Sequence, residues 1–195
     1  MGLRADLSAG EIAEQLWHAQ LALKESAGEN ASIRNVVFMG MGEPLANYGE
    51  VLLSLRSLTH QCVFDIAARH ITVSTVGDSP EVIRTLADDA PRVRLAVSLH
   101  SAKQETRHQL MPATLGAHKS LEDLGHAMDY HRSKSGFVAM IEYLVIHGVN
   151  DTPEHADALA EFCIQRSRIP DMSSTITEQR IMEGGGGGGG GFGHV

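Results

Sequence analysis

The chain has 195 residues, of which 43% are hydrophobic and 21% are charged. This composition is ordinary for a globular domain and excludes a wholly disordered or collagen-like chain. The net charge of −8 indicates that this chain does not provide the main grip on nucleic acid, because domains that grip nucleic acid on their own are usually basic, but it does not exclude an RNA substrate. No apolar run is long enough for a membrane span, and no stretch has the form of a secretory signal. With only two cysteines, no disulfide framework is expected, and a reducing compartment fits.

The predicted helices and strands alternate along the chain. Residues 8–26 are predicted to form a helix, because Ser8 and Glu11 have the form of a capping box and apolar residues recur at helical spacing behind them. Residues 35–39 form a short apolar run that ends in glycines, which is typical of a buried strand. The later elements are a helix over 47–58, a strand over 71–74, a helix over 79–86, a strand over 93–99, helices over 104–110 and 120–131, a long strand over 138–146 and a helix over 152–163.

This order predicts an α/β fold with a parallel sheet, because parallel strands need helical crossovers. A partial (βα) barrel and an open doubly wound sheet both satisfy the pattern. The first element is a helix, so we expect that a preceding strand is missing. From about Ser173 the apolar periodicity stops, and eight consecutive glycines follow. We therefore predict a domain over 1–172 and a flexible glycine-rich tail over 173–195.

Candidate functional residues follow the predicted strands, because ligands bind at the carboxyl ends of parallel strands. Gly42 and Glu43 follow the first strand, Ser74 ends the second, and Ser98, Leu99 and His100 follow the third. Glycines let a ligand approach the backbone, and a carboxylate suits an ammonium group or a sugar hydroxyl. Each feature alone is also compatible with a structural role. Glu142, inside the fourth strand, either lines the same site or is exposed or ion-paired.

The remaining histidines and cysteines show no metal-binding pattern. His126 and His131 lie five residues apart on one predicted helix, and we expect both at the surface. Cys62 and Cys163 are expected to act as small buried hydrophobic residues. No catalytic or metal-ligating residue is assigned within the chain.

Four ordered segments resemble the signatures of the radical SAM (S-adenosylmethionine) RNA methyltransferases that modify adenine C2. The first is NVVFMGMGEPL at 35–45, and the second is ITVSTVG at 71–77. The third is LAVSLHS at 95–101 with QLMPA at 109–113, and the fourth is IEY at 141–143 with GVND at 148–151. Their order and spacing make the resemblance specific over about residues 2–165.

The resemblance implies an incomplete (βα)6 barrel that carries SAM and a [4Fe-4S] cluster. It also implies that Gly42 and Glu43 hold the methionine end of SAM, and that Ser74, Ser98, Leu99 and His100 line the rest of its site. The RNA substrate would be ribosomal RNA, with transfer RNA as a second candidate, gripped through an N-terminal domain. A cytoplasmic location is expected, or an organellar one if a transit peptide was lost.

The sequence also departs from the family pattern at both ends. The CxxxCxxC cluster loop and the methyl-carrying cysteine of the family are not present in this sequence. We therefore expect strands two to five of six, in a fragment that is inactive alone. The alternative is a stand-alone, non-catalytic binding protein of the same lineage.

Overall fold

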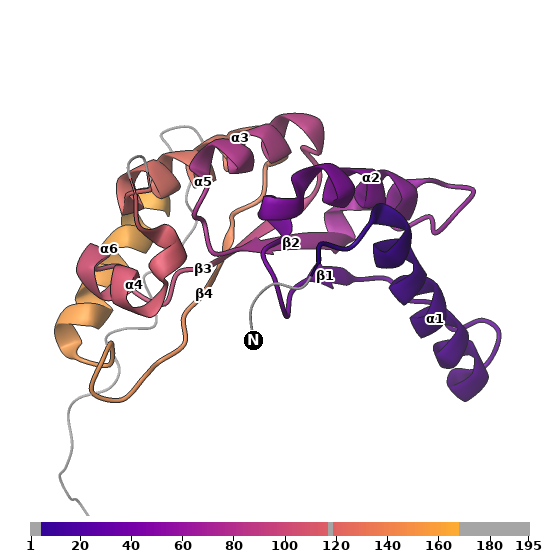
Figure 1. The fold of residues 1–195 in the computed structure, drawn as a ribbon, viewed down its shortest axis with the longest axis horizontal. Helices are drawn as coiled ribbons and strands as arrows, with labels where there is room; N and C mark the ends of the chain where they lie inside the picture. The colour runs from indigo at the N-terminus through magenta and orange to yellow at the C-terminus, as the bar shows by residue number, and fades with distance from the viewer. Residues whose placement is uncertain (1–4, 117–118, 168–195) are drawn as a thin grey trace, which may run out of the picture.

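A parallel four-stranded sheet organises the molecule, whose computed structural model describes residues 5–116 and 119–167 (Figure 1). The strands are β1 (Val36–Phe38), β2 (Ile71–Thr75), β3 (Arg94–Ser98) and β4 (Met140–Glu142). They lie in the order β1-β2-β3-β4, and each neighbouring pair is parallel. The predicted α/β class with a parallel sheet is confirmed, and the arrangement is consistent with a partial barrel.

Helices connect the strands, and two of them begin with the capping boxes that short polar side chains provide. At the start of the first helix the Ser8 side chain accepts from Glu11 N at 3.3 Å, while Ser8 N donates to Glu11 Oε2 at 2.8 Å. Ser120 and Asp123 form the same motif before the fifth helix. The α-helices are α1 (Ala9–Ala27), α2 (Tyr48–Thr59), α3 (Pro80–Asp89), α4 (Gln104–Leu110), α5 (Leu121–Ser135) and α6 (Pro153–Ser167).

The helices α2, α3 and α5 cover one face of the sheet (Figure 1). Phe38, Val73 and Leu95 lie side by side in the strand register and belong to the core on this face. On the other face Val37 and Met140 are 56% and 51% exposed. An open doubly wound sheet has helices on both faces, so the described residues match the partial barrel instead.

The two outer strands differ from their predictions. The run over 138–146 was expected to be the longest strand, yet only three of its residues pair, and Val138, Leu144 and Val145 are exposed. The strand over 35–39 is half-exposed rather than buried. Both strands lie at sheet edges, where one neighbouring strand is absent from the described sheet and burial is incomplete. The apolar content of these runs therefore overstated their burial.

The last helix packs on the core near its carboxyl end. Ala156 and Ala160 are exposed, while Phe162 enters the core and Leu159 packs beside it. The predicted tail over 173–195 lies outside the described residues. Among the described helices, none has the length and apolar character to cross a membrane.

Candidate functional site

The carboxyl ends of the strands meet at one edge of the sheet, and hydrogen bonds join them there. Glu43 Oε2 accepts from Val76 N at 2.8 Å, which ties the turn after β1 to the end of β2. Ser98 Oγ donates to Glu142 Oε2 at 3.2 Å, which ties the end of β3 to β4. We call this edge the rim, and it consists of residues 40–45, 74–78, 98–101 and 142–144.

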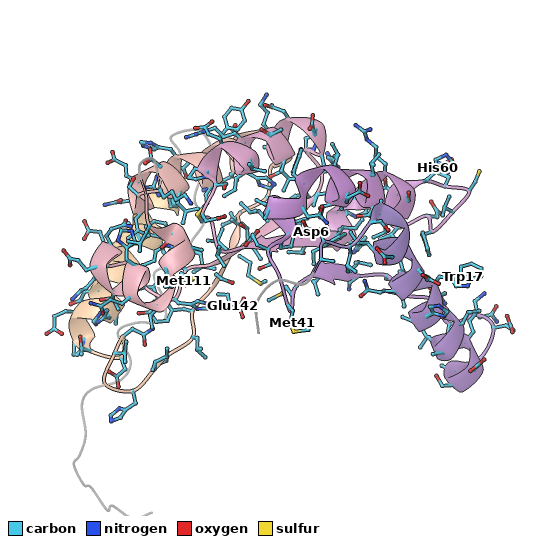
Figure 2. All side chains as sticks on the ribbon, viewed as in Figure 1. Asp6, Trp17, Met41, His60, Met111 and Glu142 are labelled. Carbon is cyan, nitrogen blue, oxygen red and sulfur yellow. The ribbon has the colours of Figure 1, made fainter. Side chains whose placement is uncertain are left out.

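The turn after β1 needs glycine at two positions because of its backbone conformation. Gly40 has φ +125° and Gly42 has φ +89°, a region that L side chains rarely adopt. Apart from the adjacent residues, no heavy atom of the described part of the chain lies within 4 Å of the position that a Cβ would take at either glycine, so the backbone is open to a ligand. Figure 2 shows Met41, which is fully exposed, at the tip of this turn.

Glu43 is half-buried at the base of the turn, and both of its carboxylate oxygens accept backbone hydrogen bonds. Oε1 accepts from Leu45 N at 3.0 Å, and Oε2 accepts from Val76 N. Burial raises the pKa of Glu43, while these N–H donors and the Thr75 hydroxyl oppose the rise. A carboxylate has about four acceptor sites and three are used here, so one remains for another donor, such as an ammonium group.

His100 presents a neutral imidazole with a defined tautomer. Its Nδ1 accepts a hydrogen bond from Leu144 N at 3.0 Å. A backbone N–H can only donate, so Nδ1 carries no hydrogen and the neutral ring carries its hydrogen on Nε2. Burial lowers the pKa of His100; Glu142 raises it and Arg107 lowers it further. The residue has φ +52°, so its backbone is held in the left-handed region.

Asn150 fastens the loop after β4 to the end of β3. Its side chain is buried, and Nδ2 donates to the carbonyls of His100 at 2.6 Å and Leu144 at 2.8 Å. Its Oδ1 accepts from Ile146 N at 2.6 Å. Asn150 therefore holds His100 from the main-chain side. It lies in the GVND segment of the family resemblance, but the sequence reading assigned it no role.

Arg107 is the largest fully buried side chain in the described part of the protein, and it is also absent from the predicted site. It extends from α4, is 1% exposed, and donates through Nη1 to the carbonyls of Ser98 at 3.0 Å and Leu99 at 2.7 Å. Its Nη2 donates to the carbonyl of Val76. Burial lowers the pKa of Arg107 to about 10, and Asp78 opposes the shift. One guanidinium therefore ties the ends of β2 and β3 together beneath the rim.

Two of the six predicted site residues belong to the rim but are buried, so they offer a ligand almost no surface. Ser74 is 7% exposed, and Leu99 is fully buried in the core. The Leu99 main chain is also committed, because its N–H donates to the Glu142 carbonyl at 2.9 Å and its carbonyl accepts from Arg107. Gly42, Glu43, Ser98 and His100 retain surface that a ligand could contact.

The structure narrows the alternatives for Glu142. Its side chain is exposed at the end of β4, on the open face of the sheet (Figure 2). It accepts from Ser98, and within 5–116 and 119–167 no cation forms an ion pair with it. A carboxylate there, on the same rim as Glu43, suits a positively charged ligand.

The residues present do not fit an iron–sulfur cluster. A [4Fe-4S] cluster is held by cysteine thiolates, and Cys62 and Cys163 are the only cysteines of the chain. Among the described residues no group of three histidine, cysteine or acidic side chains could hold a metal ion. Cys62 is exposed in the loop after α2, so its predicted burial is wrong, whereas Cys163 is half-buried on α6.

The predicted positions of the two histidines on α5 are right for one and wrong for the other. His126 is exposed, but His131 is fully buried, with Nδ1 3.4 Å from Ser135 Oγ. Burial lowers the pKa of His131, and the Val93 carbonyl opposes the shift. His131 lies at helical spacing from Leu124 and Met128, which also face the core.

Known proteins match both this fold and this sequence. A radical SAM methyltransferase from Sphaerobacter thermophilus superposes with a TM-score of 0.76 and 34% sequence identity, over 83% of this chain and 46% of that one. The parallel sheet and its rim are therefore those of a radical SAM methyltransferase fold. No family model matches the chain.

Curated sequences narrow the relationship further. A probable dual-specificity RNA methyltransferase RlmN from Salinibacter ruber is 43% identical over 161 residues, and its counterpart from Bifidobacterium adolescentis is 44% identical over 166 residues. Each match covers 83% of this chain, which spans 43% and 42% of the two relatives. The chain is a homologue of the RlmN RNA methyltransferases, and the predicted relationship to radical SAM RNA methyltransferases is confirmed.

Proposed function

We propose that this chain is the SAM-binding barrel segment of an RNA methyltransferase that methylates adenine C2 in ribosomal RNA, and in transfer RNA as a second substrate. The rim carries the proposal, because it combines an open glycine backbone with a half-buried carboxylate and a neutral imidazole that donates through Nε2. The matched RNA methyltransferases support the reaction class.

The rim residues have distinct roles in this proposal. Gly42 and Glu43 bind the ammonium of the methionine end of SAM, because Glu43 has one acceptor site left beside its present donors. Ser98 and His100 bind the opposite end of the ligand, and Asn150 and Arg107 act as positioning residues for them. Ser74 and Leu99 shape the floor of the site from beneath. When bound, SAM supplies the methyl group.

Cluster chemistry cannot be assigned to this chain's own residues. With two cysteines and no CxxxCxxC segment in the sequence, ligands for a [4Fe-4S] cluster would have to come from outside it. We therefore propose that the chain alone is inactive and is a fragment of a longer cytoplasmic enzyme whose N-terminal domain grips the RNA. The alternative is a non-catalytic SAM-binding protein of the same lineage.

Titration calorimetry of the purified chain with SAM tests the binding site. Glu43→Ala and His100→Ala should each weaken SAM binding about ten- to a hundredfold, because a hydrogen bond to a charged group is worth about 1.5–3 kcal/mol. His126→Ala is the control, since His126 is exposed on α5 away from the rim. Equal affinity of all three variants would remove Glu43 and His100 from the site.

Mass spectrometry of ribosomal RNA separates the two readings of the chain. Cells that lack their own RlmN and express this chain should contain no 2-methyladenosine if the chain alone is inactive. Restored 2-methyladenosine would refute the proposed inactivity. If the chain co-expressed with cluster-binding and C-terminal segments of a relative restores the mark, the fragment reading is supported; SAM binding without restoration favours the non-catalytic alternative.

A further inference from the structure

Arginines gather at the end of the sheet opposite the rim, although the chain as a whole is acidic. We call this surface the basic end. It consists of the segments that lead into β1, β2 and β3 together with the carboxyl end of α2, and all of its arginines are exposed. They are Arg34, Arg56, Arg69, Arg92 and Arg94.

The strand register places these arginines next to one another. Val36 pairs with Ile71, so Arg34 and Arg69 each lie two residues before the first paired position of β1 and β2. Arg94 pairs with Thr72 at the start of β3, and Arg92 lies two residues before it. Adjacent strands lie about 4.8 Å apart, so the three chain entries form one short row.

Direct contacts hold the Arg94 side chain against the main chain of Arg69 and against an aromatic ring. Arg94 Nε donates to the Arg69 carbonyl at 2.8 Å, and the Arg94 guanidinium lies 4.3 Å from the centre of the Phe137 ring. Within 5–116 and 119–167 no carboxylate forms an ion pair with any arginine of the basic end. Clustered like charges without counter-charges repel one another, which favours a bound anion.

The carboxylates in these same segments are mostly engaged elsewhere. Asp88 accepts from Lys134 at 2.9 Å and from the Tyr130 hydroxyl at 2.9 Å. Asp89 accepts from the Tyr48 hydroxyl at 2.7 Å. Asp65, in the loop after α2, is exposed. The arginines therefore outnumber the aspartates, and two of the three aspartates already have donors.

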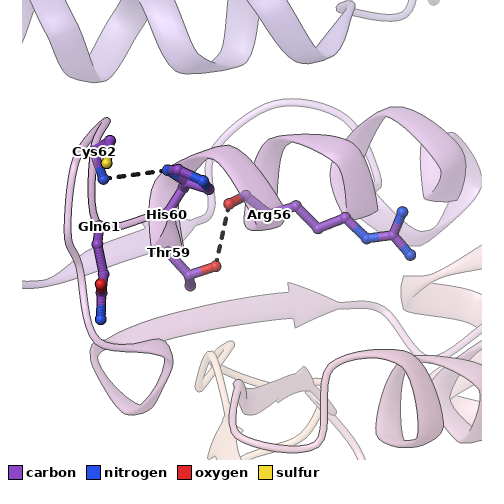
Figure 3. A pocket seen from close by; sticks show the side chains of 5 residues that line it. All are labelled: Arg56, Thr59, His60, Gln61 and Cys62. Carbon is purple, nitrogen blue, oxygen red and sulfur yellow. Dashed lines mark hydrogen bonds between the residues drawn. The ribbon is translucent and has the colours of Figure 1, made fainter.

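The surface between the arginines is hollowed. A wide hollow of about 550 Å³ at the end of α2 is lined by Arg56, Thr59, His60, Gln61 and Cys62 (Figure 3). A mostly apolar cleft of about 190 Å³ shares Arg56 and Thr59 with it, and Arg92 and Asp89 also line this cleft. Arg56 thus lies between two concavities that can receive groups larger than a single ion.

We propose that the basic end binds the phosphate backbone of RNA, as a second contact away from the rim. The inference rests on the proposed function, which makes RNA the substrate. Arginine suits phosphate because its planar fork donates two hydrogen bonds to one phosphate group. A row of guanidinium groups beside two hollows matches a chain of phosphates and riboses better than it matches scattered carboxylates.

Fluorescence anisotropy with a labelled single-stranded RNA of 20 nucleotides tests the proposal over a range of KCl concentrations. The triple variant Arg34→Gln, Arg69→Gln, Arg92→Gln should bind at least tenfold more weakly at low salt. Its log–log salt slope should fall by about 2, because each lost phosphate contact on a single strand removes about 0.7. Within the described residues the three side chains form no hydrogen bond or ion pair, so the melting temperature should not change.

A matched control removes the same charge elsewhere. Lys24, Arg84 and Lys134 each form an ion pair with a carboxylate, so Lys24→Gln, Arg84→Gln, Lys134→Gln should leave RNA affinity within about twofold. An equal loss in both triple variants, or no RNA binding by the unaltered chain, would overturn the proposal. If polyglutamate of equal total charge displaces the RNA, the basic end binds acidic proteins instead, and the proposal is overturned.

SAM calorimetry on the same proteins keeps the two ideas separate. The Arg34, Arg69 and Arg92 triple variant should bind SAM as the unaltered chain does, because the basic end lies opposite the rim. If the unaltered chain does not bind SAM, the proposed function is refuted. The RNA measurement then still decides whether the basic end binds RNA.

Discussion

Replacing Arg107 with methionine should destabilise the protein more than any surface change. Methionine fills a similar volume, but it leaves the carbonyls of Val76, Ser98 and Leu99 without their donor. Three hydrogen bonds from a charged group are worth about 1.5–3 kcal/mol each. The variant no longer buries a cation, which offsets several kcal/mol of that loss. We therefore expect a net loss of about 3 kcal/mol.

Urea unfolding followed by circular dichroism measures this loss. With a slope of about 2 kcal/mol per molar, a loss of about 3 kcal/mol lowers the urea midpoint by about 1.5 M. The urea midpoint of Arg107→Lys should lie between those of the unaltered protein and Arg107→Met, since a single ammonium cannot reach both strand ends as the guanidinium does. Hydrogen exchange of the segment 95–101 should rise in both variants, because Arg107 holds its carbonyls.

Arg84→Met is the control, because Arg84 lies on the surface of α3 beside Glu81. It should change the free energy of unfolding by less than about 0.5 kcal/mol. An Arg107→Met protein that unfolds at the same urea concentration as this control would refute the argument that the guanidinium holds β2 to β3.

Three further results are expected. Because the folded pKa of His131 lies below its ordinary value of 6.5, the free energy of unfolding should be highest above that pH and fall as the pH drops below it. His131→Leu should make the urea midpoint depend less on pH between 7.5 and 5, and an unchanged pH dependence would contradict this. Asn150→Ala should cost about 2–3 kcal/mol and raise hydrogen exchange over 143–150, and exchange like that of the unaltered chain would be the contrary outcome. Size-exclusion chromatography should show oligomers, because β1 and β4 are the edges of the described sheet. Met140→Lys should reduce the fraction of oligomers, whereas Leu53→Lys, on the exposed surface of α2, should not. A clean monomer of the unaltered chain would refute the expectation.

Local patterns in the sequence were sufficient for most elements. The helix over 104–110 was predicted with the bounds that the structure has, and the capping box at Ser8 was identified from two residue types. These features depend on neighbours within one or two turns, so they survive whatever the rest of the chain does. The carboxyl-end rule then located the rim, because a parallel sheet brings all strand ends to one edge.

The failures at Arg107 and over 138–146 have a different physical origin, since each depends on partners far away in the sequence, whereas the failure at His131 was a misreading of local helical spacing. Arg107 is buried because carbonyls at the ends of two strands receive its guanidinium, and no pattern within α4 shows this. His131 was compared with His126 rather than with Leu124 and Met128, whose spacing places it on the buried stripe. The run over 138–146 is apolar enough for a long strand, but it has only one neighbouring strand in the described sheet.

The short β4 makes the rim sensitive to local opening. Three residues pair this strand with β3, and the contacts that extend the attachment are the main-chain bond from Leu99 to Glu142 and the Asn150 side chain. Such a segment can detach at a lower free energy than global unfolding requires. Each detachment would break the Ser98–Glu142 contact and remove the Leu144 donor from His100. A ligand that needs the assembled rim would therefore slow amide exchange in β4. The slowing would grow with the ratio of the ligand concentration to its dissociation constant.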